Sequence, residues 1–384
     1  MSLTFNARLN DVGTSRIRAF NTLAKQTPGC ISLTIGEPDF DTPEPICDAV
    51  IHSLQNKETH YCPNAGSDEL RAKAASFENG RRHTAYTKEN VCITIGASEA
   101  LFSSLYTILN PGDEVIIPLP AYPAYVNLVH LCGVVPVFLD LSTADFQMHK
   151  EMLENVIGDK TKAIILNSPN NPTGTILNAE SIQAVHDVMK THPMYALIDA
   201  VYEQLSFLDE VPCLLSYPDI LDQCILVQSF SKPYAMTGWR MGYVCASEDF
   251  INAFMKVHIY AISCPPSLFQ KACMTALDYD PAQMKEAYHR RSMFLYKSLL
   301  DMQLPVPEPQ GAFYVFPCIR EFGMDDETFC KEMIQKAGVA AVPGSAFGMP
   351  GSIRLSSCVN EEKLQEAMRR MKLFVTQLRE NTHA

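Results

Sequence analysis

The chain has 384 residues, of which 47% are hydrophobic and 19% charged, so it can bury a large core and does not resemble a disordered protein. This length accommodates two domains. The net charge of −12 disfavours nucleic acid or an anionic membrane as a partner, although one pocket can differ from the average and hold a small anion.

Thirteen cysteines are scattered singly through apolar stretches, without a CxxC pair or a Cys/His cluster of zinc spacing. This pattern is typical of reduced core thiols, so we expect a cytoplasmic location and no metal. The first residues lack a basic segment followed by an apolar run, and no apolar window approaches about 18 residues. We therefore expect neither a signal peptide nor a transmembrane helix.

Short β-rich runs dominate the middle of the chain, and several are apolar without alternation, as expected of strands covered on both faces. Helical patterns lie between them. Leu101, Leu105 and Ile108, for example, share one face of a helix that follows the first run. The alternation predicts an α/β fold with a mostly parallel, seven-stranded sheet. The runs are residues 90–96, 113–120, 134–140, 162–169, 195–202, 224–231 and 242–247.

The pattern changes past about residue 280. A long helix is predicted over residues 282–302, a second near 326–338 and a third from about residue 361, with short strands between them. The first forty or so residues do not show the alternation of strands and helices that predicts the large sheet. We therefore predict a large domain, residues 41–281, and a smaller α+β domain formed by residues 1–40 and 282–384.

Five of the β-rich runs end in side chains that can carry chemistry. In an open α/β sheet, ligands bind beyond the carboxyl ends of the strands, so these side chains are expected to meet in one crevice. They comprise an anion-binding helix start, an aromatic pair, a polar turn, a carboxylate with a tyrosine, and a hydroxyl-rich segment with a lysine. In chain order they are Ala97 and Ser98, Tyr122 and Tyr125, Asn170 and Asn171, Asp199 and Tyr202, and Ser229, Ser231 and Lys232.

Lys232 stands among apolar neighbours in the stretch SFSKPYAMTGWRMGY, and Arg240 follows eight residues later. Lysine is seldom buried without a reason. Ordinary interpretations remain open for single residues: Lys232 can reach solvent through its stem, Arg240 can form a structural ion pair, and Asn171 can belong to a plain turn. Asp199 is harder to explain in this way, because a buried carboxylate needs a cation or strong donors.

Together these residues suit a flat heteroaromatic ring that bears a phosphate, an aldehyde and a basic nitrogen. The Lys232 amine can condense with the aldehyde, Arg240 and the helix start can hold the phosphate, and Asp199 can pair with the ring nitrogen. Desolvation and neighbouring cations would lower the pKa of Lys232 and leave a free amine. Burial of Lys232 is then a requirement of its reactivity.

Nine stretches resemble the class I and II aminotransferases of fold type I, which depend on pyridoxal 5′-phosphate. They follow the family's order from about residue 31 to 357 and cover most of the chain. The sequence of these stretches most resembles a bacterial branch of the family, which contains aminotransferase A-like, aromatic amino acid and N-acetyl-diaminopimelate aminotransferases. The stretches are SLTIGEPDF, HYCPNAGSDELR, ITIGASEAL, PLPAYPAY, LNSPNNPTG, IDAVYEQL, SFSKPYAMTGWRMGY, GAFYVFP and IRLSS.

The resemblance implies a role for each matching residue around the cofactor ring. Lys232 would form the covalent imine link and carry a proton to and from the substrate. Asp199 would bond the pyridine nitrogen, Tyr202 and Asn171 would bond the phenolic oxygen, and Tyr122 would stack on the ring. Catalysis is thereby assigned to Lys232, Asp199 and Tyr202.

The resemblance also implies how the two anionic groups are held. The phosphate would be bound by the backbone of Ala97 and Ser98, by Ser229 and Arg240, and by Tyr61 from the partner subunit of a homodimer. Arg354 would clamp the substrate α-carboxylate, helped by Gly36 and Asn171.

The expected reaction is a ping-pong transamination between an L-amino acid and a 2-oxo acid such as 2-oxoglutarate. No unambiguous second arginine marks a dicarboxylate specialist, so aromatic or long-chain donors are favoured. Three alternatives stay open. The same cofactor supports a carbon–sulfur β-lyase; residues 96–100, GASEA, fall one residue short of the GxSxG turn of a serine hydrolase; and a non-catalytic regulator can share the fold.

Overall fold

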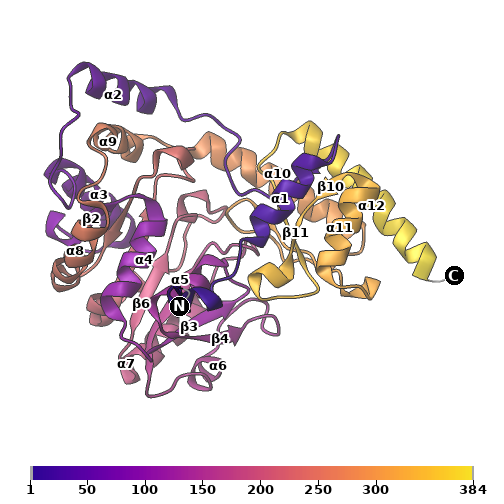
Figure 1. The fold of residues 1–384 in the computed structure, drawn as a ribbon, viewed down its shortest axis with the longest axis horizontal. Helices are drawn as coiled ribbons and strands as arrows, with labels where there is room; N and C mark the ends of the chain where they lie inside the picture. The colour runs from indigo at the N-terminus through magenta and orange to yellow at the C-terminus, as the bar shows by residue number, and fades with distance from the viewer. Residues whose placement is uncertain (1–2, 383–384) are drawn as a thin grey trace.

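The computed structural model describes residues 3–382, which form a larger and a smaller unit lying side by side (Figure 1). Each of the seven predicted β-rich runs overlaps one strand of a single seven-stranded sheet, which confirms the predicted α/β fold. The strands of this sheet are β2 (Val91–Thr94), β3 (Glu114–Leu119), β4 (Val135–Asp140), β5 (Thr161–Asn167), β6 (Tyr195–Asp199), β7 (Cys224–Ser229) and β8 (Gly242–Cys245).

The strand order is β2-β8-β7-β6-β5-β3-β4. β8 runs antiparallel to both of its neighbours, whereas the other pairs are parallel. In this register Asn167, the last residue of β5, lies opposite Asp199, the last residue of β6. The polar ends of the parallel strands therefore gather at one edge of the sheet.

Helices cover both faces of this sheet. Along β3, Ile116 packs into the core that contains α2, α3, α7 and α9, whereas Val115 and Ile117 pack into the opposite core with α4, α5 and α8. Because successive residues of a strand are buried on opposite faces, the strands appear in the sequence as continuous apolar runs. The helices of the larger unit are α2 (Glu44–Gln55), α3 (Asp68–Arg82), α4 (Gly96–Ile108), α5 (Ala124–Cys132), α6 (Lys150–Glu154), α7 (Ala179–Thr191), α8 (Glu248–Ile262) and α9 (Gln270–Asp278).

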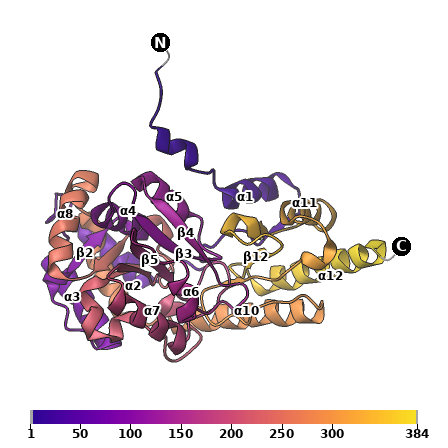
Figure 2. The same ribbon diagram turned by 90° about the horizontal axis from the view of Figure 1, so that it is seen from below.

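The smaller unit contains a three-stranded antiparallel sheet and a two-stranded parallel one. Its strands are β1 (Ile31–Ser32), β9 (Tyr314–Val315), β10 (Val339–Ala340), β11 (Val342–Pro343) and β12 (Ile353–Ser356). Its helices are α1 (Arg16–Gln26), α10 (Ala282–Asp301), α11 (Asp326–Ala337) and α12 (Glu361–Thr382). Helices α10 and α12 pack together and extend away from the larger unit (Figure 2).

The N-terminal segment packs with the C-terminal part of the chain. Strand β1 pairs with β10, and Phe20 and Leu33 share one hydrophobic core with residues between Leu295 and Leu378. This packing supports grouping residues 1–40 with 282–384, although the domain boundaries stay a prediction. Residues 1–2 and 383–384 of that predicted domain lie outside the described residues.

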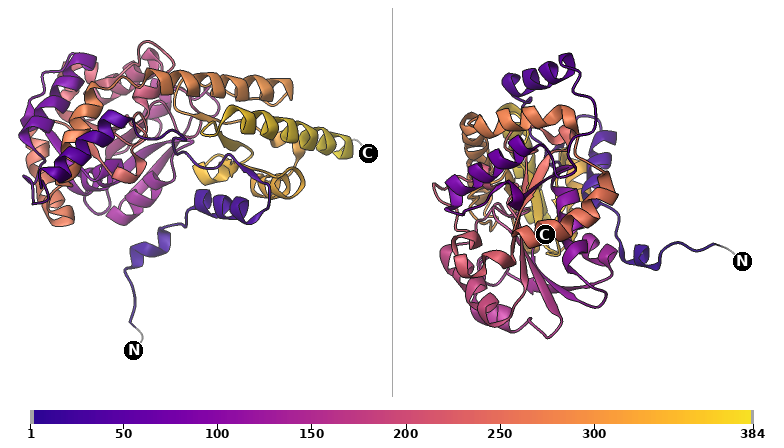
Figure 3. Two further views of the ribbon diagram at one scale, coloured as in Figure 1. Left: turned by 90° about the horizontal axis from the view of Figure 1, so that it is seen from above. Right: turned by 90° about the vertical axis from the view of Figure 1, so that its left-hand side faces the viewer.

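Before α1 the chain projects away from the body as an arm (Figure 3). A short 3₁₀ helix, η1 (Ala7–Asp11), runs beside α5, where the Arg8 guanidinium donates to the carbonyl of Leu131 at 3.3 Å. Leu3 and Phe5 are almost fully exposed. No helix within residues 3–382 is long and apolar enough to cross a membrane.

Candidate active site

One cavity, of about 800 Å³, opens where the two units meet. Eleven of the twelve site residues predicted from the sequence line it, and they come from both units. These are Gly36, Ala97, Ser98, Tyr122, Asn171, Asp199, Tyr202, Ser229, Lys232, Arg240 and Arg354. Tyr61 does not line this cavity; its side chain is 91% exposed and lies beside another surface pocket.

Lys232 lies just beyond the end of β7, on the wall of the cavity. Its Nζ donates to the carbonyl oxygen of Gly36 at 2.7 Å. Desolvation lowers the pKa of Lys232 to about 8, and the cations Arg354 and Arg240 act in the same direction. The amine is therefore far easier to deprotonate than an ordinary lysine. A side chain at Gly36 would place its Cβ 1.7 Å from the Tyr314 hydroxyl, so the close approach at this position requires glycine.

Asp199 ends β6 and is almost fully buried. Its Oδ2 accepts a hydrogen bond from the Tyr125 hydroxyl at 2.6 Å, and its Oδ1 accepts from the Val201 N–H at 3.3 Å. Burial raises the pKa of Asp199 to about 6, while these donors and Lys232 oppose the rise. The carboxylate is thus ionised at neutral pH but lacks an ion-pair partner among the described residues, which suits it to a cationic ligand group.

Arg354, on β12, is buried and faces the polar turn that follows β5. Its Nη1 donates to Asn171 Oδ1 at 2.9 Å and its Nη2 donates to the carbonyl of Thr34 at 2.5 Å. Its Nε is buried without a partner among the described residues. The guanidinium lies over the ring of Tyr314, 4.4 Å from its centroid. An arginine held in this way presents a fixed, planar guanidinium on the wall of the cavity.

Another part of the cavity wall combines a helix start with an arginine. Helix α4 begins at Gly96, and its N-cap residue Ile95 provides no side-chain cap, so the first N–H groups are available to an anion. A Cβ at Gly96, where φ is +69°, would lie 2.8 Å from Arg240 Nη2. Glycine at this position therefore lets the Arg240 guanidinium rest against the start of α4, beside Ser98.

Basic side chains outnumber acidic ones around the cavity. Arg18, Lys232, Arg240 and Arg354 line it, against Glu37 and Asp199. None of the four basic groups makes a salt bridge with an acidic residue of the described chain. In a protein of net charge −12, this local excess of positive charge indicates a site for anionic ligands.

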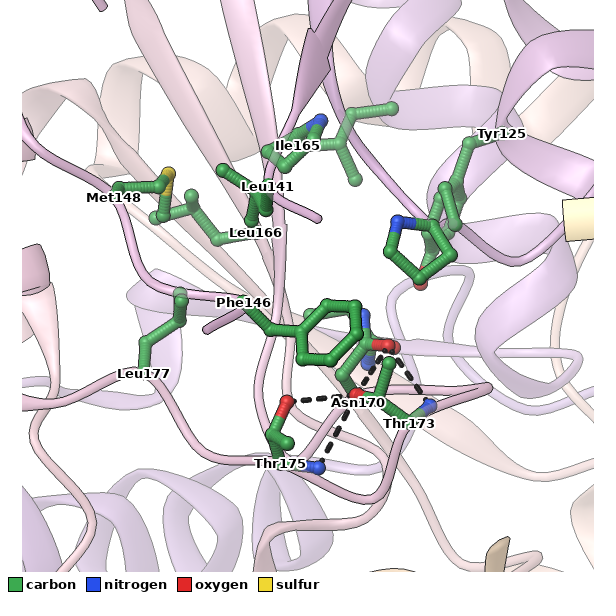
Figure 4. Close-up of a pocket in the computed structure, with 14 residues that line it drawn as sticks. Tyr125, Leu141, Phe146, Met148, Ile165, Leu166, Asn170, Thr173, Thr175 and Leu177 are labelled. Carbon is green, nitrogen blue, oxygen red and sulfur yellow. Dashed lines mark hydrogen bonds between the residues drawn. The ribbon is translucent and has the colours of Figure 1, made fainter. Parts of the chain in front are cut away.

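Tyr125 and Asn167 also line a second cavity, which is drawn in Figure 4. It measures only about 30 Å³ and is lined mostly by apolar side chains such as Phe146 and Met148. Asn170 and Thr173 close one side of it through a hydrogen bond of 3.0 Å. It has room for water but not for a heteroaromatic ring, so the large cavity is the candidate site.

The sequence did not reveal three contributions. The sequence indicates Tyr125 only as an aromatic wall, yet its hydroxyl donates to Asp199. The Asn167 side chain donates to the Asp199 carbonyl at 3.0 Å and accepts from the Asn171 N–H at 2.9 Å, so it fixes two walls of the site. The Tyr314 hydroxyl lies 3.0 Å from that of Tyr202. The motifs PLPAYPAY, LNSPNNPTG and GAFYVFP contained these residues, but a motif does not show which partner a hydroxyl or amide finds.

Comparison with known proteins places this site in a family. The family described as "Aminotransferase class I and II" matches residues 28–371. A probable N-acetyl-LL-diaminopimelate aminotransferase of Bacillus subtilis is 37% identical, over 99% of this chain and 98% of its own. Aromatic-amino-acid aminotransferase 2 of Thermococcus litoralis is also 37% identical, over 96% of this chain and 97% of its own.

Solved structures agree with the sequence relatives. The aspartate aminotransferase of Thermotoga maritima superimposes with a TM-score of 0.93 at 34% identity, and covers 97% of this chain and 100% of its own. That of Thermus thermophilus, solved with maleate, has a TM-score of 0.91 at 32% identity, over 97% of this chain and 99% of its own.

Fold and site together define a fold type I enzyme dependent on pyridoxal 5′-phosphate. The chain belongs to the class I and II aminotransferase family, and it is an aminotransferase. The relatives are named as aminotransferases, which does not favour the β-lyase alternative.

The residues present fit that cofactor. A lysine with a lowered pKa, a buried carboxylate without a cationic partner in the described chain, and an uncapped helix start beside an arginine match its aldehyde, ring nitrogen and phosphate in turn. Arg354 lines the same cavity and can add a cation for a further anionic group.

Proposed function

We propose that this aminotransferase moves the amino group of an L-amino acid, with aromatic or other long-chain donors favoured, to a 2-oxo acid such as 2-oxoglutarate. The reaction is ping-pong: the donor leaves as a 2-oxo acid before the acceptor binds. The observation that carries the proposal is the Lys232 amine, with a pKa near 8, in a cavity that it shares with the buried Asp199 carboxylate. The named relatives that accept aromatic or dicarboxylic amino acids support the choice of substrates.

Five residues would hold the cofactor ring and act on the substrate. When bound, pyridoxal 5′-phosphate withdraws electrons from the substrate Cα and makes its proton removable. Lys232 would hold the cofactor covalently and then use Nζ to take up and return that proton. Asp199 would keep the ring nitrogen protonated, Tyr202 and Asn171 would donate to the phenolic oxygen, and Tyr122 would stack on the ring.

The phosphate would lie at the start of α4. The backbone N–H groups of Ala97 and Ser98, the Ser229 hydroxyl and Arg240 would bind it, and Arg240 would contribute two parallel donors. Tyr61, exposed in a single chain, would reach the phosphate of a partner subunit, so we propose a homodimer with shared sites.

The substrate α-carboxylate would bind Arg354 as a bidentate pair, next to Gly36 and Asn171. This contact would fix the Cα–H bond relative to Lys232 Nζ and exclude water from between them. The cytoplasmic location expected from the cysteines stays a prediction.

Absorbance and mass spectrometry test the assignment directly. Purified protein loaded with the cofactor should be yellow and should bleach when an amino donor is added. Borohydride reduction followed by peptide mapping should place the cofactor on Lys232. An unmodified Lys232 in cofactor-saturated protein would overturn the proposal.

A second experiment separates the two reactions that the cofactor supports. A panel of amino donors is tested with 2-oxoglutarate, and cysteine conjugates are tested for release of pyruvate and ammonia. Transfer that requires a 2-oxo acid is expected, with aromatic donors giving the highest kcat/KM. Release of ammonia without a 2-oxo acid, at a rate above that of transfer, would instead establish the β-lyase.

A further inference from the structure

Helix α1 presents a mostly polar face to the cavity. Ile17, Arg18, Asn21 and Thr22 line it, at the spacing of one side of a helix, while Phe20 packs on another side into the core of the smaller unit. The orientation of α1 is therefore fixed by an apolar contact. Because of that contact, Arg18 faces the cavity from a rigid element and not from a loose arm.

The two arginines in the first turn of α1 have different surroundings. Arg16 points away from the cavity, where its Nη1 lies 3.1 Å from Glu327 and donates to Ser345 Oγ at 3.0 Å. The Arg18 side chain has no hydrogen bond or salt bridge to another described residue, and its backbone N–H donates to Ser15 Oγ at 3.3 Å. Arg18 is therefore an available cation, and Arg16 is not.

Hydrogen bonds connect α1 to the proposed α-carboxylate site. Asn21 Oδ1 accepts from the Thr34 hydroxyl at 3.3 Å, and the Thr34 carbonyl accepts from Arg354. Arg18 stands one turn before Asn21. Its charge also reaches Tyr122: burial raises the pKa of Tyr122, and Arg354, Arg18 and Arg240 all oppose that rise. Arg18 thus belongs to the same electrostatic environment as the two anion-binding arginines.

The proposed function assigns a cationic partner to each anionic group that it names, and none of these groups is assigned to Arg18. The phosphate would occupy Arg240, the α-carboxylate would occupy Arg354, and Lys232 would hold the cofactor. We propose that Arg18 binds the distal carboxylate of a dicarboxylic 2-oxo acid, and of the amino acid formed from it. This inference rests on the proposed function, since it takes Arg354 as the α-carboxylate site.

Because Arg18 is exposed, its proposed role in binding a carboxylate is compatible with the binding of apolar amino donors in the same cavity. A surface arginine stays hydrated when an aromatic side chain occupies the cavity, so leaving it unpaired has little cost. A buried arginine in that position would exclude such donors. One site can then accept an aromatic donor in the first half of the reaction and a dicarboxylic acceptor in the second.

The test compares Arg18→Met with Arg16→Met, a matched change of the same residue type in the same helical turn. We expect Arg18→Met to lower kcat/KM for 2-oxoglutarate by about tenfold to a hundredfold, mainly through KM, because a charged hydrogen-bonded pair is lost. For the monocarboxylic acceptor 2-oxobutyrate, both variants should stay within about threefold of the wild type. Arg18→Lys should fall between the wild type and Arg18→Met for 2-oxoglutarate.

An equal loss for both acceptors, or an equal loss in Arg16→Met, would overturn the assignment of Arg18. Calorimetric titration of the cofactor-loaded protein with glutarate and with butyrate provides a readout that does not depend on turnover. Tighter binding of glutarate that disappears in Arg18→Met and persists in Arg16→Met is expected. If the wild type fails to transaminate any pair of substrates, the proposed function fails, and the glutarate comparison still decides whether Arg18 binds a second carboxylate.

Discussion

Two regions of this molecule bury charge, and they do so in opposite ways. Between α3 and the sheet, the Arg82 guanidinium contacts both Glu78 and Glu203, and Arg81 contacts the second carboxylate of the pair at 3.3 Å. The Tyr243 hydroxyl donates to the remaining oxygen of Glu78. Two arginines and two glutamates therefore neutralise one another.

The active-site cavity shows no such balance. Its basic groups, including Lys232 and Arg354, make no salt bridge with an acidic residue of the described chain, and Asp199 is held by neutral donors. A charge left unpaired in a low-dielectric site is unfavourable unless a ligand completes it. The comparison teaches that pairing offsets the cost of burying charge within the fold, whereas buried charge without a partner indicates a place where a ligand can bind.

The largest expected effect follows from removing the reactive amine. Lys232→Ala should lower transamination by about a thousandfold or more, since it deletes the group that moves the proton. The free energy of unfolding of the cofactor-free protein should not fall, because a desolvated cation without an acidic partner contributes no favourable pair. Steady-state assays and chemical denaturation measure the two quantities. Transamination at the wild-type rate would contradict the assignment.

Removing a charge from the buried cluster of Arg82, Glu78 and Glu203 should instead lower the stability of the fold. Arg82→Met should lower the free energy of unfolding by about 3–5 kcal/mol, because Glu78 and Glu203 are left buried without their shared cation. Arg81→Met is the control; its partly exposed pair with Glu203 should contribute only about 0–1 kcal/mol. Urea denaturation checks both values, and equal effects of the two variants would show that burial is not what separates them.

A change of pH should reveal the cost of ionising Asp199. Its pKa is raised to about 6 in the folded state from an ordinary value of 3.8, so the folded state binds more protons than the unfolded state between these values. The stabilisation is complete below pH 3.8 and disappears as the pH rises through about 6. Relative to Asp199→Asn, the cofactor-free wild type should lose up to about 3 kcal/mol across this range. A stability difference that does not change with pH would contradict the raised pKa.

The smallest expected effect concerns the hydroxyl that supports Asp199. Tyr125→Phe should weaken cofactor binding by about tenfold and raise the pKa of Asp199 further, because a donor to the carboxylate is removed. Tyr86→Phe is the matched control, since the buried Tyr86 hydroxyl has no partner among the described residues. Titration of the cofactor-free variants with pyridoxal 5′-phosphate, followed by absorbance, compares them. Equal affinities would leave Tyr125 with a packing role alone.

The sequence predicted the large sheet because its strands are buried on both faces and separated by regular helices. It also predicted residues that line one cavity, because the carboxyl ends of parallel strands such as β5, β6 and β7 must meet at one edge. In these cases sequence order determines spatial order. The short strands β1 and β10, each two residues long, lie in the smaller unit and pair residues that are about three hundred positions apart.

The sequence could not predict contacts that depend on the direction in which a side chain points in the folded protein. Tyr125 meets Asp199 from 74 residues away, and the direction of a hydroxyl is set by packing. Arg16 and Arg18 are almost adjacent in the sequence, yet the packing of Phe20 and Ala24 in their core decides which of them faces the cavity. Tyr61 is predicted through its role in a partner subunit, and it lies on the surface of the single chain.

The division of the cavity wall between two bodies has a mechanical consequence. Arg18 and Arg354 are anchored in the smaller unit, whereas Lys232 and Arg240 are anchored in the larger one. A rotation of one body against the other would change the gap between these pairs and leave the spacing within each pair intact. Under the proposed roles, a substrate that contacts Arg354 and Lys232 would therefore bridge the two units.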